Sequence, residues 1–493
     1  MEANNKTRVP VAKRRPGSFR AEKSRVITRP YIPGSDHRVR EVISRVLRLS
    51  GEEVTTLLEE VLQEFSDRHR YFKEILEKNY LKIEHCVPDK ESVTPEMRLL
   101  LGAYFTCEYS VEAAALFNPS IVVHPDQKKK PEGTVRFIMS FRATGEGHIS
   151  SIEFRSGQID KDGSILFDPI SNYVETPVLY TDKLYYKHLF GLKLNEMVAI
   201  NEVTTHLLGG LGDQFTFDQI VERVAELESR TDFDSEHKRK AIDMAMWLAR
   251  SNYEVKFRPD HRISERVIFP VSENESRGIE DARFVRFTDD DGTVCYYATY
   301  TAYNGFVILP QLITTKDFIT FKINTLNGKA VQNKGMALFP RKIGGRYVML
   351  SRQDGENNHI MFSDNINFWQ ESEIIQTPAQ PWEFVQIGNC GSPIETSKGW
   401  LLLTHGVGPM RKYSMGIELL DLDDPSKIIG RLDDPILIPS SEEREGYVPN
   451  VVYSCGAIIH NDELIIPYAI ADQRTSIATV SVPDLLSLMS PAT

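Results

Sequence analysis

The chain has 493 residues, of which 41% are hydrophobic and 26% are charged, and its formal net charge is −11. This composition is typical of a folded globular protein and excludes a disordered or fibrous chain. The length suffices for one large domain and a smaller one. The acidic excess disfavours general binding of nucleic acid. No apolar run approaches membrane-spanning length, so we expect no membrane partner and a cytoplasmic location.

The first 35 residues are rich in basic side chains, whereas the chain as a whole carries an acidic excess. Between Lys6 and Arg25 lie eight lysines and arginines but only one acidic residue, Glu22. Such a segment could bind phosphate or an acidic neighbour, but a basic run of this kind is more often solvated. We therefore predict a basic, flexible tail over residues 1–35.

Residues 36–116 have the pattern of a helical extension. Apolar residues recur at helical spacing between residues 39 and 65, with a break at Ser50-Gly51. Thr94 is a good N-cap and is followed by Pro95 at the first helical position. These signals predict a further helix that starts at Thr94 and runs to Leu116.

Short β-like segments separated by glycine and polar turns follow Asn118-Pro119 and continue to about residue 485. Many short strands at fairly regular spacing are typical of a propeller, a barrel or a sandwich. No strict repeat decides between these architectures. We predict a β domain over residues 117–485, with a helical insertion at about 205–255 that packs on its outside.

The five cysteines suggest neither disulfides nor a metal site. They are odd in number and widely spaced, which fits neither a disulfide framework nor a paired CxxC motif. The histidines show no HExxH pattern or similar ligand spacing. We therefore predict reduced thiols and no metal site.

Two adjacent carboxylates, Glu280 and Asp281, are the most informative feature of the chain. They lie in the segment GIEDARF, next to a β-rich run. Neighbouring side chains of an extended strand point to opposite faces, so the two need not share a role. One could donate a proton in a cleft while the other binds the framework or a substrate. Taken alone, such a segment is more often a solvated turn with a local Asp/Arg pair.

Further polar residues recur near strand ends throughout the β region, as a central cleft would require. Each has an ordinary alternative: the cations could be surface residues, and His405 a hydrogen-bonded core histidine. They are Asn118, Arg142, the segment 145–148, Lys334, Arg352, Asp354, His405, Arg411, Tyr413, Tyr447, Asn450 and Asp472.

An ordered set of segments resembles glycoside hydrolase family 130, which contains β-mannoside phosphorylases and mannosidases. The segments are FNPS, SFRA, GIEDARF, KGMALFP, THGV, GYVPNVVYSCG and PYAIAD, and they occur in the order of the family between about residues 117 and 480. The resemblance implies a mainly β fold, a five-bladed β-propeller with its active site in the central cavity. The N-terminal helical extension and the helical insertion would be additions to it.

The resemblance also implies roles for individual residues. Asp281 matches the general acid of the family, which protonates the glycosidic oxygen through the 3-hydroxyl of the mannose; Ala282 stands where the family usually has proline. The phosphate-binding positions are Lys334, Arg352 and His405, with Tyr413 or Arg411 completing the set. Sugar-binding positions are Asn118, Arg142, Asp354 and Asp472, and Glu280 is a framework or acceptor-side residue.

Phosphorolysis and hydrolysis make different demands on such a site. An inverting hydrolase needs a second carboxylate that activates water, for which Glu356, Glu383 and Glu445 are candidates. A phosphorylase needs a cationic cradle for phosphate instead. The cations favour an inverting phosphorylase of β-mannosides that yields α-D-mannose 1-phosphate. A β-1,2 linkage is the first expectation, and β-1,4 substrates stay open.

Two alternatives remain at this stage, a hydrolase of the same fold and a carbohydrate-binding propeller without catalysis. We expect no cofactor beyond inorganic phosphate as co-substrate. The helical extension could also support a homo-oligomer.

Overall fold

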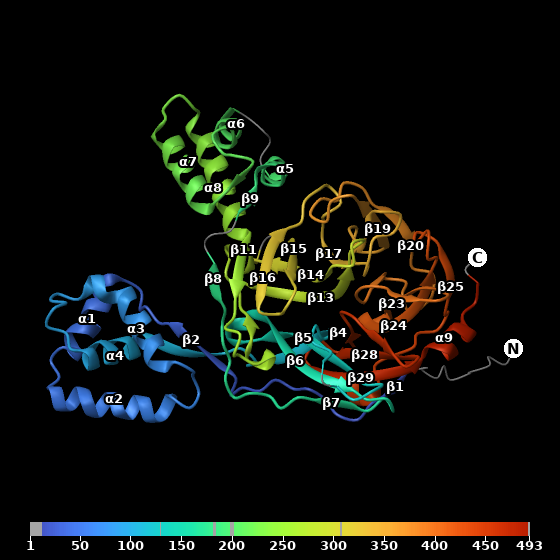
Figure 1. Ribbon diagram of the computed structural model, residues 1–493, viewed down its shortest axis with the longest axis horizontal. Coiled ribbons are helices and arrows are strands. Elements are labelled where there is room, and N and C mark those ends of the chain that lie inside the picture. The colour runs from blue at the N-terminus through green and yellow to red at the C-terminus, as the bar shows by residue number, and fades with distance from the viewer. Residues whose placement is uncertain (1–11, 129, 181–183, 198–201, 306–307, 492–493) are drawn as a thin grey trace.

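The computed structural model describes residues 12–128, 130–180, 184–197, 202–305 and 308–491. Figure 1 shows three regions: a helical region of residues 36–104, a helical insertion of residues 187–251, and a large β body formed by most of the remaining chain. The mainly β fold expected from the sequence is confirmed. Among the described residues, no helix combines the length and the apolar character needed to cross a membrane.

Most strands of the β body form antiparallel meanders. The first contains β4 (Ala115–Val123), β5 (Val135–Thr144), β6 (Ser150–Ile159) and β7 (Ile165–Phe167). The second contains β13 (Gly278–Thr288), β14 (Val294–Tyr303), β15 (Ile308–Thr315) and β16 (Thr320–Thr325). The third contains β17 (Lys334–Leu338), β18 (Tyr347–Arg352), β19 (Asn358–Ser363) and β20 (Glu373–Gln376).

Two further meanders complete the β body. The fourth contains β21 (Gln386–Asn389), β23 (Gly399–Gly408), β24 (Lys412–Leu420) and β25 (Ile428–Arg431). The fifth joins the two ends of the chain, because β26 (Val452–Tyr453), β28 (Glu463–Ile470) and β29 (Arg474–Ser481) are completed by β1 (Lys13–Arg14). Successive meanders are in contact, and β28 of the fifth contacts β4 of the first. Every residue of β23 is buried, as expected for strands covered on both faces.

The predicted flexible tail is wrong for the part of it that the structure describes. Strand β1 pairs with β29, and β2 (Val26–Pro30) pairs with β3 (Thr106–Ser110). Between them the Arg25 guanidinium is 2% exposed and lies 2.6 Å from Glu112 and 2.7 Å from Glu153. The basic residues of this segment therefore find carboxylates far along the chain, which composition alone does not reveal.

The helical region consists of α1 (Asp36–Val46), α2 (Gly51–Phe65), α3 (Phe72–Ile83) and α4 (Pro95–Tyr104). The predicted break at Ser50 is confirmed, since Ser50 forms a capping box with Glu53 at the start of α2. Thr94 caps α4 as predicted. The predicted extension of this helix to Leu116 is wrong, because the following residues form β3 and the start of β4. Residues 105–110 are rich in aromatic and β-branched side chains, which favour strands.

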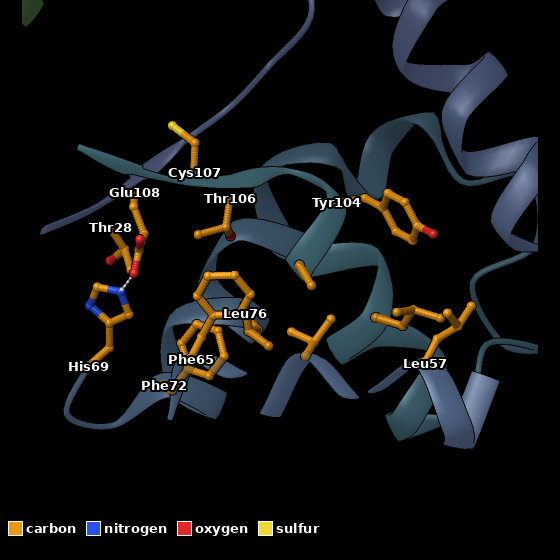
Figure 2. A pocket seen from close by; sticks show the side chains of 13 residues that line it. Thr28, Leu57, Phe65, His69, Phe72, Leu76, Tyr104, Thr106, Cys107 and Glu108 are labelled. Atoms are coloured by element: carbon orange, nitrogen blue, oxygen red, sulfur yellow. Dashed lines mark hydrogen bonds and ion pairs between the residues drawn. The ribbon is translucent and has the colours of Figure 1, made fainter. Parts of the chain in front are cut away.

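An apolar pocket of about 420 Å³ lies within the helical region, between its helices and β3. Figure 2 shows Phe65, Phe72 and Leu76 on its wall and the His69–Glu108 pair at one side. His69 Nε2 lies 2.8 Å from Glu108 Oε1. The pocket contains none of the residues that the sequence singles out for chemistry.

The helical insertion leaves the β body at β8 (Val178–Tyr180) and returns at β11 (Tyr253–Lys256), two strands that pair with each other. It contains α5 (Lys187–Met197), α6 (Glu202–Gly209), α7 (Phe217–Ser229) and α8 (Ser235–Ser251), and it has its own apolar core. Helices α7 and α8 lie where the sequence predicts helices. The insertion starts earlier than the predicted residue 205, since α5 begins at Lys187. The apolar residues of α5 are not confined to one face, so its sequence lacks the helical spacing that the prediction relied on.

Candidate active site

The Asp281 side chain is presented by an irregular part of β13. The pairing of β13 with β14 is interrupted between Glu280 and Arg283, and Asp281 has φ 55°. Strand β4 is interrupted in the same way around Asn118, which has φ 47°. Left-handed non-glycine residues cost about 1–3 kcal/mol and cluster at functional sites. The two bulges direct the side chains toward each other, and Asn118 Nδ2 donates to Asp281 Oδ1 at 2.6 Å.

Two cations surround the carboxylate pair. Arg142, near the end of β5, lies 3.3 Å from Asp281 Oδ1 and 2.8 Å from Glu280 Oε1. Its Nε donates to Ser150 Oγ at 2.9 Å, which fixes the guanidinium. The other Glu280 oxygen lies 3.1 Å from Lys334 Nζ. Glu280 thus bridges Arg142 and Lys334, and its role as a framework or acceptor-side residue stays a prediction.

The ionisation of Asp281 is set by these neighbours. Burial acts to raise the pKa of the carboxyl, but Arg142, Arg283 and the hydrogen bond from Asn118 outweigh burial, and the pKa lies below its ordinary value. Asp281 is therefore ionised at neutral pH in this structure. Negative charge brought near the same cations would raise the pKa and let Asp281 carry a proton.

A second group of predicted residues lies on the neighbouring meanders. Lys334 and Arg352 are directly opposite each other in β17 and β18. Arg352 Nη1 lies 2.9 Å from His405 Nε2, and His405 Nδ1 lies 3.2 Å from the Asn389 carbonyl oxygen. The Tyr413 ring is stacked on the imidazole with centroids 5.9 Å apart. Lys334, Arg352, His405 and Tyr413 are thus brought together as expected.

His405 is neutral in this arrangement. Burial, followed by the charges of Arg352 and Arg283, holds the pKa of the imidazole well below its ordinary value. The partners assign the tautomer: Nδ1–H donates to the Asn389 carbonyl, and Nε2 accepts from Arg352. His405 therefore orients the Arg352 guanidinium, and its own contact with phosphate stays a prediction.

Arg411 and Asp472 lie in tight turns between strands. Arg411 has φ 53° in the β23–β24 turn, and Asp472 has φ 50° in the β28–β29 turn. Burial and the charge of Asp281 raise the pKa of Asp472 to about 6, although Arg142 and Arg411 act in the opposite direction. Asp472 therefore shares the electrostatic environment of Asp281 and Arg142.

Asp354 is oriented differently from the other predicted residues. Its Oδ1 accepts from the backbone N–H groups of Glu356 at 2.9 Å and Asn357 at 2.8 Å, and its Oδ2 lies 3.0 Å from His359 Nε2. All of these partners belong to the turn after β18 or to the start of β19. The structure does not join Asp354 to the group around Asp281, and its sugar-binding role stays a prediction.

Arg283 and Tyr453 are site residues that the sequence analysis did not select. The Arg283 side chain is 3% exposed and donates to the Tyr453 hydroxyl, and the Tyr453 ring packs edge-on against His405 at 4.9 Å. These contacts connect the Asp281 segment to the Arg352–His405 group. The available signals were an arginine inside the strand segment EDAR and a tyrosine inside VVYSCG.

Three polar atoms of the site have unused hydrogen-bonding capacity. In the described part of the chain, Asn118 Oδ1, Arg283 Nε and Arg352 Nε are buried and have no hydrogen-bond partner. Such atoms are uncommon in folded proteins and call for an explanation. A bound polar ligand would supply one.

The carboxylates proposed for water activation differ in their surroundings. Glu383 is fully buried, and its Oε1 accepts from the Ala379 and Gln380 N–H groups and from Arg431 at 2.9, 3.0 and 3.1 Å. It is thus a structural residue. Glu356 and Glu445 are exposed. Among the described residues, the group of three potential metal ligands is Asp36, His85 and Cys86, all in the helical region.

Comparisons with known proteins assign the family. The model of the family Glyco_hydro_130, described as β-1,4-mannooligosaccharide phosphorylase, matches residues 232–491. The 1,2-β-oligomannan phosphorylase of Thermoanaerobacter sp. is 37% identical over 233 residues, which are 45% of this chain and 75% of that protein. The β-1,2-mannobiose phosphorylase of Listeria innocua is 32% identical over 226 residues, 44% of this chain and 62% of that protein.

A solved structure of the Listeria innocua enzyme with β-1,2-mannobiose is also similar. It is 22% identical, with a TM-score of 0.45, and the match covers 77% of this chain and 92% of that chain. The family match spans more than half of the chain and includes Asp281, Lys334, Arg352 and His405. The chain belongs to glycoside hydrolase family 130.

Proposed function

We propose that the protein is an inverting phosphorylase of β-1,2-manno-oligosaccharides. It would transfer the terminal mannosyl group to inorganic phosphate and release α-D-mannose 1-phosphate and a shortened sugar. The names of the relatives support the linkage: β-1,2-specific phosphorylases match at 37%, 32% and 35% identity. A β-1,4-mannooligosaccharide phosphorylase of Ruminococcus albus matches at 30%.

One observation carries the proposal, the placement of Asp281 beside a set of cations on neighbouring strands. The carboxylate touches Arg142, and Glu280 connects Arg142 to Lys334, which is opposite Arg352. Phosphate is already anionic and needs no base, but it needs cations and hydrogen-bond donors. Lys334 and Arg352 would bind it, with Arg411 or Tyr413 as further contacts.

To act as an acid, Asp281 needs a pKa higher than the one it has in this structure. Lys334 is one of the cations that lower this pKa, so phosphate bound beside Lys334 would offset its charge, raise the pKa and allow Asp281 to hold a proton. A phosphate oxygen then attacks C1 of the mannose while the bond from C1 to the glycosidic oxygen breaks. The proton of Asp281 ends on the leaving oxygen, through the 3-hydroxyl of the mannose as the family resemblance implies. Attack from the opposite face inverts the anomeric configuration.

We also propose that the five meanders are the blades of a five-bladed β-propeller. Their succession along the chain and the contact of the last meander with the first support this arrangement. The site residues would then surround the central axis, where Asn118, Arg142, Glu280, Asp354 and Asp472 bind sugar hydroxyls. The free state of the five cysteines supports a cytoplasmic location. Oligomerisation through the helical region remains a prediction.

The test is incubation of the full chain with β-1,2- and β-1,4-mannobiose, each with and without phosphate. The proposal expects phosphate-dependent loss of β-1,2-mannobiose and formation of mannose 1-phosphate. Free mannose released at an equal rate without phosphate would identify a hydrolase instead. Sugar binding without turnover, unaffected by Asp281→Asn, would identify a binding protein.

A further inference from the structure

Three equivalent turns of the β body share an unusual backbone. Each joins the second and third strands of a meander: residues 145–149 between β5 and β6, 409–411 between β23 and β24, and 471–473 between β28 and β29. Each contains two successive residues with positive φ, and the second of these is His148, Arg411 or Asp472. Since Arg411 and Asp472 are candidate site residues, the equivalent position of His148 makes it a candidate site residue as well.

His148 forms an exposed aromatic pair with Tyr447. The two rings lie 5.9 Å apart and are inclined by 27°, and Tyr447 is 65% exposed. His148 is exposed as well. A tyrosine this exposed is not held by the core. A flat aromatic surface open to solvent suits the apolar face of a pyranose ring, and the Tyr hydroxyl and imidazole suit its hydroxyls.

Both members of the pair are tied to the Asp281 environment through short connections. His148 is two residues before Ser150, whose Oγ accepts from the Arg142 side chain at 2.9 Å. Tyr447 is next to Val448, whose N–H donates to the Ala471 carbonyl at 2.9 Å, beside Asp472. A Cβ at Gly446 would lie 2.5 Å from the Ala471 Cβ, so glycine is needed for this close packing. The two rings are therefore connected, through Ser150 and Val448, to the surroundings of Arg142 and Asp472.

We propose that the His148–Tyr447 pair is a binding platform for a hexose unit on the leaving-group side of the substrate. This inference rests on the proposed function: since a terminal mannose is removed, every further sugar lies on that side. Among the contacts of the described residues, the pair reaches the site only indirectly, through Ser150, which binds Arg142, and through Val448, which binds the residue before Asp472. It therefore binds a unit beyond the two that flank the broken bond, and it makes the enzyme favour oligosaccharides of three or more units.

The experiment compares phosphorolysis of β-1,2-mannobiose and β-1,2-mannotriose by the wild-type chain and four variants. Tyr447→Ala removes the platform, Tyr447→Phe keeps its ring, and His148→Ala removes the supporting ring. Tyr31→Ala is the matched control, because Tyr31 is 55% exposed and lies between β2 and the helical region, far along the chain from both His148 and Tyr447. We expect Tyr447→Ala to raise KM and lower kcat/KM for the trisaccharide about 3- to 10-fold, with the disaccharide changed less than about twofold. Tyr31→Ala should behave as wild type, and Tyr447→Phe, which keeps the ring but loses the hydroxyl, should lower kcat/KM for the trisaccharide less than Tyr447→Ala does.

Calorimetric titration with β-1,2-mannotriose separates this inference from the proposed function. If the wild-type chain binds the trisaccharide without phosphorolysis, and Tyr447→Ala weakens that binding, the platform stands and the proposed function fails. Equal loss on both sugar lengths, or no change in Tyr447→Ala, would overturn the platform while phosphorolysis stands. A wild-type chain that neither binds nor cleaves either sugar would overturn both.

Discussion

Two buried clusters of arginines and carboxylates occur in the β body, and they differ in exposure and backbone. In the first, Arg25 and Arg155 pair with Glu112 and Glu153, and all four side chains are 0–3% exposed. In the second, Arg142 pairs with Glu280 and Asp281, and the side chains are 13–19% exposed. Asp281 also has positive φ. Burial of charge alone therefore does not mark the site; partial access and a left-handed backbone do.

The largest effect is expected from Asp281→Asn. The amide keeps the shape of the side chain but cannot donate a proton as an acid, so kcat for phosphorolysis should fall on the order of 10²–10⁴-fold. Arg142 retains Glu280, and the fold should persist. Mannose 1-phosphate release and circular dichroism check both points. Activity within tenfold of wild type would remove Asp281 from the chemistry.

The matching change in the other cluster is Arg25→Ala. The substitution leaves the buried carboxylates of Glu112 and Glu153 with less positive charge beside them, so the free energy of unfolding should fall by about 3–5 kcal/mol. Denaturant unfolding measures this loss. The control is Arg341→Ala, which removes an exposed pair with Glu395 and should cost less than about 1 kcal/mol. An equal loss of unfolding free energy in the two variants would mean that the Arg25 cluster does not stabilise the N-terminal segment.

Arg352→Ala tests the cationic part of the site. Loss of charge-assisted hydrogen bonds to phosphate should raise the KM for phosphate about 10- to 100-fold while leaving the KM for mannobiose nearly unchanged. Arg286→Ala is the control, because Arg286 is an exposed arginine of β13. Initial rates at varied phosphate give both constants. A rise in the mannobiose KM alone would assign Arg352 to the sugar.

The smallest effect concerns Asp472 and pH. Its pKa is raised from 3.8 to about 6, so the folded chain holds this proton more tightly than the unfolded chain. The stability it contributes is present below about pH 4 and is lost as pH rises through 6. Asp472→Asn should therefore be more stable than wild type by about 1–3 kcal/mol at pH 7, and the difference should vanish below pH 4. Denaturant unfolding at both pH values checks this, and a less stable variant at pH 7 would contradict the assignment.

Local sequence signals predicted much of the helical region and little of the site geometry. Ser50 and Thr94 are caps that act within one turn, so the helix starts they predict are confirmed. By contrast, Asn118 and Asp281 meet through bulges in strands 163 residues apart. No local pattern encodes such a register. Their association was expected only because the ordered segments resemble a family.

The same limit explains the wrong prediction for the N-terminal segment. Arg25 donates to Glu153, which lies 128 residues further along the chain. Because neither carboxylate partner of Arg25 is near it in the sequence, the local pattern predicts a solvated charge. Arg283 was missed for a related reason. Its partner Tyr453 lies in another meander, 170 residues away. Long-range pairing of charges is the feature that composition and periodicity do not report.

Identification of the first sugar product tests the central claim most directly. The wild-type chain, β-1,2-mannobiose and phosphate are mixed in an NMR tube, and the anomeric proton and phosphorus signals are followed from the start of the reaction. The account predicts α-D-mannose 1-phosphate as the first product, in equal amount with free mannose from the leaving unit. Release of two free mannose molecules per disaccharide, without a sugar phosphate signal, would contradict it.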